Sequence, residues 1–445
     1  MTNSSPDNVD LILRARWVIP VEPANTVLEH HSIAIRDSKI VAIADTDEIT
    51  ANFQADTVTE LADHALIPGL INTHTHAAMS LMRGLADDLP LMTWLNDHIW
   101  PAEGKWISKD YVRQGTEQAV AEMIRSGTTC FNDMYFFPDA AGAVASAAGI
   151  RACIGLIVID FPSAWATNWQ EYLDKGLAVN DQFRNDELIT RAFAPHAPYS
   201  VSNEPLQKIL TYSDELDIPI HIHLHETQDE IDQGMANHGS RPLHRLAELG
   251  LLTPSLMAVH MTHLQDDEIE HFSKTGAHIV HCPQSNMKLA SGFCPVQRLQ
   301  DAGINVALGT DGAASNNDLD MLAEMQSAAM LGKAVANDAA AVSAETALEM
   351  ATINGAKALG IDDITGSLAV GKAADITAID LSQLETRPLY NPVSQIVYAA
   401  DRQQVTHVWC NGKALLKDRE LQTLDMNKLL NNADSWQEKL KEHHE

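Results

Sequence analysis

Eight short apolar runs recur through the middle of the chain, and segments of helical composition separate them. Short β-rich runs that alternate with helices predict parallel strand–helix units, and eight units favour a (β/α)₈ barrel. A doubly wound sheet is the alternative, although it would not gather all the strand ends around one axis. The predicted strands are Leu66–His74, Thr129–Met134, Ala152–Ile159, Leu188–Pro195, Ile218–Leu224, Met257–His263, His278–Cys282 and Asn305–Thr310.

Alternating, strand-like segments also occur near both ends of the chain. They are Val9–Pro20 and His31–Ile43 at the start, and Gly366–Asp380 and Val405–Lys413 toward the end. A chain of 445 residues is long enough for a large barrel and an accessory domain. We therefore expect residues 1–66 and 365–445 to form a small β-sandwich domain, with residues 67–364 as the catalytic barrel.

Reactive side chains follow the predicted strands at the end where barrel enzymes carry their chemistry. The first strand ends in His74-Thr75-His76, and residues two apart on a strand point to the same face. Such a pair is half of a metal site, although an isolated pair is as readily an ordinary strand-to-loop turn. The residues that follow later strands are His196, His223, Glu226, His260, His263, His281 and Asp311.

A metal site at these strand ends would have to use imidazole and carboxylate ligands. The five cysteines are scattered and form no Cys-x-x-Cys pair, which argues against a disulfide framework or a thiolate site. His221, His223 and His225 alternate along one strand, so only one or two can reach a shared centre. Asp311, between Thr310 and Gly312, could complete a set of three histidines and one aspartate suited to Zn²⁺ or Fe²⁺; alone it would suggest only a turn.

The net charge of the chain limits which partners it can bind. Sixty acidic residues against 30 basic ones give a formal charge of −30, which would repel nucleic acid and anionic membranes. No apolar run approaches the roughly 20 residues that span a bilayer. The first eight residues lack the basic start and apolar core of a secretory signal, so we expect a cytoplasmic protein with a small-molecule substrate.

Taken together, the motifs resemble the amidohydrolase superfamily, in particular its mononuclear deaminase and chlorohydrolase branch and the 5'-methylthioadenosine/S-adenosylhomocysteine deaminases within it. The resemblance covers nearly the whole chain. Triazine hydrolases and guanine deaminases share the scaffold, so an amino- or chlorohydrolase acting on such heterocycles is the alternative. The matching segments are 68–76 (PGLINTHTH), 83–91 (RGLADDLPL), 100–103 (WPAE), 194–200 (APHAPYS), 223–227 (HLHET) and 309–317 (GTDGAASNN).

The resemblance implies one divalent metal ion per subunit, Zn²⁺ or alternatively Fe²⁺. The implied ligands are His74, His76, His223 and Asp311. The metal would make hydroxide available near neutral pH, and Asp311 would take the proton of the water.

The same resemblance assigns catalytic roles outside the ligand set. Glu226 would protonate the ring nitrogen beside the attacked carbon, and His260 would hydrogen-bond the hydroxide, with His263 as its rival. The implied reaction is hydrolytic deamination of an adenine nucleoside at C6, giving an inosine-type product and ammonia.

Substrate choice should depend on residues beyond the metal. The resemblance implies that Glu103 binds the ribose hydroxyls and that His196 also contacts the substrate, whereas Glu103 alone would suggest an acid at a helix start. Arg151 is interpreted as structural. A dimer or tetramer is common in the resembled family. Four tryptophans are candidates for an apolar pocket around the 5' substituent, although tryptophans more often serve only packing: Trp94, Trp100, Trp165 and Trp169.

Overall fold

The computed structural model describes residues 6–441. Residues 1–5 and 442–445 lie outside the described part. Both segments belong to the expected terminal β domain, and residues 1–5 also belong to the N-terminal segment that lacks the features of a secretory signal. The middle of the chain forms eight consecutive strands in the order β6 to β13, and every paired neighbour is parallel. They are β6 (Leu70–Thr75), β7 (Thr128–Asp133), β8 (Arg151–Val158), β9 (Ile189–Pro195), β10 (Ile220–Leu224), β11 (Leu256–His260), β12 (His278–His281) and β13 (Val306–Leu308).

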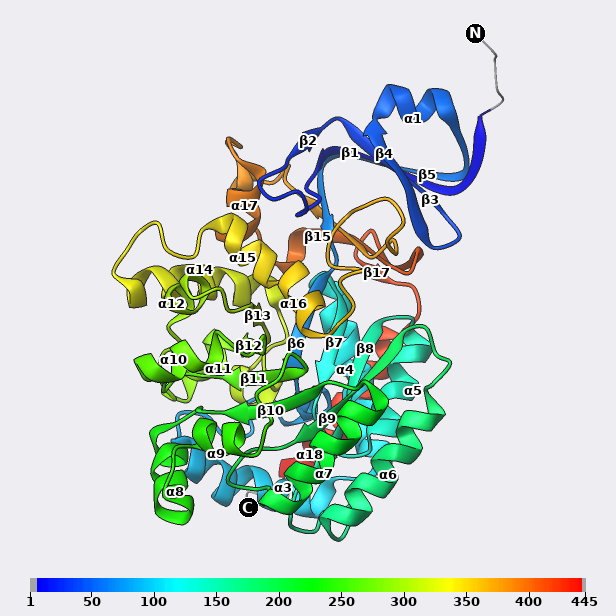
Figure 1. The fold of residues 1–445 in the computed structure, drawn as a ribbon. Helices are drawn as coiled ribbons and strands as arrows, with labels where there is room; N and C mark the ends of the chain where they lie inside the picture. Colours follow the sequence, from blue (N-terminus) through cyan, green and yellow to red (C-terminus); the bar gives the residue numbers. More distant parts are fainter. Residues whose placement is uncertain (1–5, 442–445) are drawn as a thin grey trace.

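Helices cover the outer face of these strands (Figure 1), and side chains packed inside the barrel cover the inner face, so the strands are buried on both faces. Burial on both faces explains why the strands are nearly continuous apolar runs. The predicted (β/α)₈ barrel is therefore confirmed, with strand ends within a few residues of those expected. The main surrounding helices are α4 (Lys109–Arg125), α5 (Pro138–Ala148), α6 (Trp169–Gln182), α7 (Asn203–Leu216), α8 (Gln228–His238), α9 (Pro242–Glu248), α10 (Asp266–Phe272), α11 (Pro283–Lys288), α12 (Val296–Asp301), α14 (Met321–Ala336), α15 (Ala344–Met350) and α16 (Ile353–Ala358).

Short polar caps determine where several of these helices begin. The side chains of Ser108, Asn168 and Thr227 accept hydrogen bonds from backbone amides in the first turns of α4, α6 and α8. These bonds satisfy amides that have no partner within the helix. Gly149 ends α5 with φ at 81°, a conformation that a residue without a side chain adopts at little cost. The caps thus hold the loops at the strand ends, where the reactive residues lie.

The two ends of the chain meet in a separate mixed sheet of nine strands, as expected from the sequence (Figure 1). The N-terminal strand β5 pairs with the C-terminal strand β14, which joins the two halves. The strands are β1 (Asp7–Val18), β2 (Leu28–Glu29), β3 (His31–Arg36), β4 (Lys39–Asp45), β5 (Phe53–Pro68), β14 (Ile376–Asp380), β15 (Val405–Cys410), β16 (Lys413–Lys417) and β17 (Glu420–Leu421).

The last helix, α18 (Met426–Lys441), packs on the barrel and not on the terminal sheet (Figure 1). The indole Nε1 of Trp436 donates a hydrogen bond to Gln114 of α4 at 3.0 Å, and its ring meets Tyr111 edge-on with centroids 5.0 Å apart. The division of the chain at residues 67 and 365 stays a prediction. It assigns α18 to the terminal domain, whereas the helix packs on the barrel. Within residues 6–441, no helix is both long and apolar enough to cross a membrane.

Candidate active site

The two histidines of the first strand point toward one carboxylate. His74 is fully buried at the end of β6, and His76 follows that strand. Their Nε2 atoms lie 3.3 Å and 3.2 Å from Oδ1 of Asp311, which follows β13. The first and last strands of the barrel therefore bring these three side chains together, as the alternation of the strand predicts.

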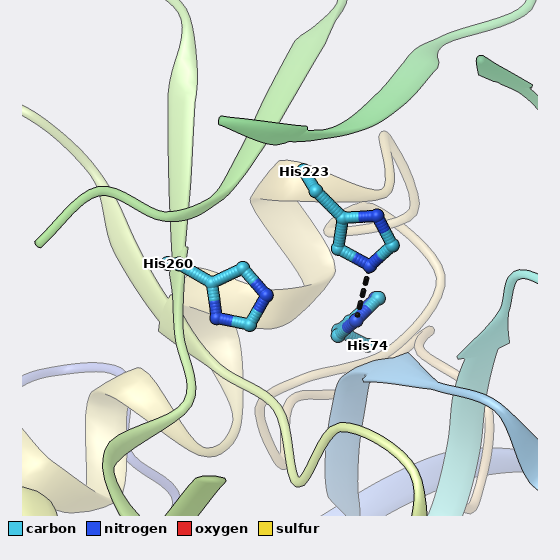
Figure 2. A group of neighbouring side chains, drawn as sticks. All are labelled: His74, His223 and His260. Atoms are coloured by element: carbon cyan, nitrogen blue, oxygen red, sulfur yellow. Dashed lines mark hydrogen bonds between the residues drawn. The ribbon is translucent and has the colours of Figure 1, made fainter. Parts of the chain in front are cut away.

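His223 of β10 completes this cluster from the opposite side of the barrel. Its Nε2 lies 3.1 Å from Nε2 of His74, the contact marked in Figure 2. Nδ1 of His223 lies 2.7 Å from the carbonyl oxygen of His196, and Nδ1 of His76 lies 2.6 Å from that of Met134. A carbonyl only accepts, so each Nδ1 carries a proton and each ring turns its Nε2 toward the centre.

Asp311 is held in one orientation by side chains of two short helices, α11 and α13 (Ala313–Asn316), and by the backbone of Gly312. Its Oδ2 accepts hydrogen bonds from Ser285 at 2.6 Å and Ser315 at 3.1 Å, and Oδ1 accepts one from the amide of Gly312 at 2.7 Å. The backbone of Asp311 has φ at 64°, a left-handed conformation that costs energy for a residue with a side chain. These contacts aim Oδ1 at the histidines.

The charges in this cluster suit a cation. Burial works to raise the pKa of Asp311, but hydrogen bonds from His74 and His76 hold it well below its usual range. Burial lowers the pKa of His74 to about 4, whereas at His76 the Asp311 carboxylate outweighs burial and raises the pKa to about 9. Lone pairs facing one another at about 3 Å repel unless a positive charge lies between them. The donor set of imidazole nitrogens and one carboxylate therefore fits a divalent metal such as zinc.

His260 and Glu226 lie beside the cluster. His260, at the end of β11 with φ at 76°, shares a group of three histidines with His74 and His223 whose ligand atoms all lie within 4.8 Å (Figure 2). Its Nδ1 donates to Oδ1 of Asn286 at 2.8 Å, so Nε2 is directed to Oε2 of Glu226, 3.7 Å away. The predicted pair therefore lies together at the edge of the ligand group.

Glu226 is a buried carboxyl group in a well-defined position. Burial raises its pKa, the first requirement for a side chain that delivers protons near neutral pH. The carboxylate of Glu230 accepts the backbone amides of Glu226 and His225 at 2.8 Å and 2.9 Å and so fixes the turn that carries Glu226. Ser291 Oγ lies 3.4 Å from Oε1 of Glu226 and gives the carboxyl one further partner.

The remaining histidines of these strands have other partners. His263, the rival of His260, places Nε2 2.7 Å from the carbonyl oxygen of Ser291. His225 lies one residue past the end of β10, and its Nε2 accepts the amide of Leu243 at 3.0 Å. His281, in the seventh strand, is buried, and burial lowers its pKa to about 3.

A cavity of about 340 Å³ opens from the cluster, and Glu103 and His196 line it together with Glu226. Glu103 Oε1 accepts the hydroxyl of Tyr135 at 2.6 Å, and burial raises the pKa of Glu103 to about 7. Burial lowers the pKa of His196 to about 3, so its ring is neutral; its Nδ1 lies 2.9 Å from Ser200 Oγ. Both predicted substrate residues therefore face the same space as the cluster.

The tryptophans divide between this cavity and the packing around it. Trp94 and Trp100 line the cavity, as expected. Trp165 packs edge-on against Phe137 at a centroid distance of 5.2 Å, and Trp169 begins α6; among residues 6–441, neither belongs to the cavity lining. The expectation for these two was wrong, because the direction of a loop side chain depends on neighbours distant in the sequence.

Several supporting residues were not anticipated. His221 places Nε2 3.0 Å from Nδ1 of His74, and Asn286 holds His260. Ser285 and Ser315 orient Asp311, and Tyr135 orients Glu103. Of these, only His221 carried a signal, because it alternates with His223 along the strand. Its side chain faces the barrel interior one layer below the cluster and supports a ligand there.

A parallel barrel with a histidine–aspartate cluster at its strand ends, next to a buried carboxyl and a cavity, is typical of metal-dependent hydrolases. The Amidohydrolase family model matches residues 65–415. The chain therefore belongs to the amidohydrolase family, and the expected fold and hydrolase class are confirmed.

Individual relatives are similar along the whole chain. A 5-methylthioadenosine/S-adenosylhomocysteine deaminase of Saccharophagus degradans is 52% identical over 440 residues, which cover 99% of this chain and 98% of that protein. A 5'-deoxyadenosine deaminase of Methanothermobacter thermautotrophicus is 43% identical over 394 residues, 88% of this chain and 91% of that protein. The crystal structure of an adenosine deaminase from Xanthomonas campestris with bound zinc superimposes with a TM-score of 0.97 at 49% identity, covering 98% of this chain and 100% of that one.

Proposed function

We propose that the protein is a zinc-dependent deaminase of adenine nucleosides that replaces the 6-amino group of a 5'-methylthioadenosine-type substrate by oxygen and releases ammonia. The observation that carries this proposal is one cavity with a metal-type cluster and Glu226 at one end and Glu103 further along its wall. A purine nucleoside needs both features, a hydrolytic centre for the ring and an acceptor for the ribose. The relatives named above are all deaminases of adenine nucleosides.

The proposed metal ligands are His74, His76, His223 and Asp311, with one ion per subunit. When bound there, zinc lowers the pKa of a coordinated water to about 7, so that hydroxide is available at neutral pH. The donor set suits Fe²⁺ as well, and zinc is favoured by the ion in the X. campestris structure.

Proton transfer is the task of two carboxyl groups. Asp311 Oδ1, which faces the histidines, is placed to accept the proton that the attacking water loses. Glu226, buried and with a raised pKa, delivers a proton to N1 of the purine, since attack at C6 would otherwise leave negative charge on the ring. Glu226 then takes up the proton of the hydroxyl that has added to C6 and passes it to the departing amine, which leaves as ammonia. The proton that Asp311 accepted from the water restores Glu226 for the next cycle.

His260 orients the reacting oxygen. Because Asn286 accepts from Nδ1, the Nε2 of His260 faces the space between Glu226 and the metal ligands. From there it can hydrogen-bond the oxygen that adds to C6 and stabilise the charge that develops on it.

Glu103 and His196 position the nucleoside. The carboxylate of Glu103 already accepts one hydroxyl, that of Tyr135, and its remaining lone pairs face the cavity. Two vicinal ribose hydroxyls can donate to it, and a substrate without them would leave a buried acceptor unpaired at a cost of about 1–3 kcal/mol. His196, which is neutral, can exchange a hydrogen bond with the purine or sugar at its Nε2.

The proposal is tested by a substrate screen on protein of measured zinc content. We expect turnover of 5'-methylthioadenosine with release of ammonia and a shift of the purine absorbance, and little turnover of guanine or aminotriazines. If an aminotriazine or guanine is preferred over every adenine nucleoside, the proposal is wrong. A cytoplasmic location and a dimer or tetramer complete the proposal, and light scattering would test the second.

A further inference from the structure

The outer part of the active-site cavity is built from two apolar walls. One is the segment 91–104, which comprises α2 (Leu91–Trp94), η2 (Leu95–Ile99) and most of α3 (Trp100–Trp106). The other is the loop 159–164 after β8. Trp100 of the first wall meets Phe161 of the second with ring centroids 6.3 Å apart and planes at 62°. The two walls therefore touch through aromatic edges at this part of the cavity.

Apart from Glu103, two polar side chains that line these walls, Trp94 and Ser163, are already engaged. Trp94 Nε1 donates to the carbonyl oxygen of Ala86 at 3.1 Å. Ser163 Oγ accepts the amide of Trp165 at 3.0 Å and also bonds the hydroxyl of Tyr172. A polar group of a ligand would have to compete with these bonds, whereas an apolar group would meet only hydrocarbon and ring surface.

Apart from the histidines of the cluster, the charged groups that line the cavity are acidic. Of the side chains between residues 6 and 441 that line it, none is a lysine or arginine, whereas Glu103, Glu226 and Asp311 all face it. Basic residues on flanking segments have acidic partners elsewhere. These pairs are Arg83 with Glu122, Lys175 with Glu171 and Lys288 with Asp87.

We propose that this chain selects nucleosides with a short, uncharged 5' substituent, such as methylthio or hydrogen, over the homocysteine arm of S-adenosylhomocysteine. The proposal rests on the proposed function and assigns the walls 91–104 and 159–164 to the 5' substituent. Glu103 and Trp100, three residues apart on α3, lie on adjacent parts of one helix face. A ribose held by Glu103 therefore places its 5' substituent close to the aromatic wall.

The physical reason is the cost of removing charges from water. The homocysteine arm ends in a carboxylate and an ammonium group, and each needs a partner when it is buried. The carboxylate finds no lysine or arginine in the described lining and is repelled by the acidic groups. A methylthio group has no such requirement and gains about 25 cal/mol for each Å² of apolar surface that it buries.

A matched substrate series separates charge from size. We would measure kcat/KM of the zinc-loaded enzyme for 5'-methylthioadenosine, 5'-deoxyadenosine, 5'-butylthioadenosine and S-adenosylhomocysteine, whose arm has the same chain length as butylthio. The expected result is a kcat/KM for butylthioadenosine at least about 100-fold above that for S-adenosylhomocysteine, in line with an unpaired buried charge. Equal values for these two substrates would overturn the inference while leaving the deaminase proposal intact. Absence of turnover with every nucleoside would overturn both.

A variant tests the same point from the side of the protein. Phe161→Arg places a cation in the second wall, where 44% of the Phe161 side chain is exposed and a longer side chain can be accommodated. We expect the ratio of kcat/KM for S-adenosylhomocysteine to that for butylthioadenosine to rise by about tenfold, the value of one charge-assisted hydrogen bond. Val370→Arg, at a 65% exposed position near the terminal sheet, is the control and should leave the ratio unchanged. A parallel change for both substrates in Phe161→Arg would contradict the proposal.

Discussion

The backbone amide of Asp311 donates a hydrogen bond to the carbonyl oxygen of His74 at 3.0 Å. This bond lies where the barrel closes, between β13 and β6, which are the two ends of the strand order and contact each other. Thr73 Oγ1 strengthens the seam with a bond to the carbonyl oxygen of Leu308 at 2.5 Å. His74 and Asp311, which this bond joins, are both proposed metal ligands. Closing the barrel therefore also brings these two ligands together.

Gly309 should be indispensable to this seam. A Cβ atom at Gly309 would lie 2.7 Å from the backbone nitrogen and 2.8 Å from Cβ of His74, and backbone cannot yield as a flexible side chain can. We expect Gly309→Ala to destabilise the fold by about 1–3 kcal/mol and to lower the zinc content at saturating metal. Thermal unfolding and metal analysis provide the measurements.

A glycine with free space is the matched control for this change. A Cβ at Gly104, within α3, would meet nothing within 4 Å, so Gly104→Ala should keep its zinc and be as stable as the parent or slightly more so. If both variants retain full zinc and stability, the seam tolerates more movement than the structure indicates.

His221 should tune the affinity for the metal without binding it. Its Nε2 accepts Nδ1–H of His74 at 3.0 Å in the tautomer that leaves His74 Nε2 free to coordinate. His221→Ala should weaken zinc binding by about 10–100-fold, measured by competition with a chelator. His278→Ala is the control, because His278 begins β12 at the end of the strand away from the cluster, and this variant should bind zinc as the parent does. An unchanged zinc affinity in His221→Ala would show that His221 does not support the metal site.

Glu226 should be required for chemistry and dispensable for metal. Glu226→Gln keeps the shape of the side chain but cannot deliver a proton, so we expect kcat to fall by about 10²–10⁴-fold with unchanged zinc content. Glu215→Gln, at an exposed position of α7, serves as the control and should be fully active. Turnover at the parental rate in Glu226→Gln would exclude the carboxyl from the mechanism.

The sequence was most informative where function follows regular strand geometry. The alternation of His74 and His76 and the position of Asp311 after the last strand were sufficient to place three side chains around one point. The orientation of His260 beside that point was not predictable, because it depends on Asn286 of α11.

Segments outside the barrel strands were harder to predict for the same reason. Whether α18 packs on the barrel or on the terminal sheet depends on the contact between Trp436 and Tyr111, which are more than 300 residues apart in the sequence. The direction of Trp165 likewise depends on Phe137 and not on its own loop. Local sequence patterns do not predict such distant contacts, whereas a repeated strand–helix unit predicts how its own strands and helices are arranged.

Arg151 should stabilise the contact between the barrel and the terminal sheet. Its Nε lies 2.6 Å from Asp375 Oδ2, and the two side chains are 7% and 0% exposed. Loss of one partner leaves the other charge buried, so Arg151→Met should lower the free energy of unfolding by about 3–5 kcal/mol. Arg298→Met, which removes the exposed pair with Asp266, should cost no more than about 1 kcal/mol. Denaturant unfolding would compare them, and equal losses would contradict the structural role.

The pH dependence of substrate binding should report on Glu103. Burial raises the pKa of this carboxyl to about 7, so it is protonated below that pH and ionised above it. The ionised form accepts stronger hydrogen bonds from two ribose hydroxyls, and KM for 5'-methylthioadenosine should therefore fall as the pH rises through about 7. In Glu103→Gln, which cannot titrate, KM should be higher and nearly independent of pH between 6 and 8. A 2',3'-dideoxyadenosine substrate gives the matched test in the parent enzyme, because it cannot use the carboxylate. The same fall of KM with pH for both substrates would show that another group is responsible.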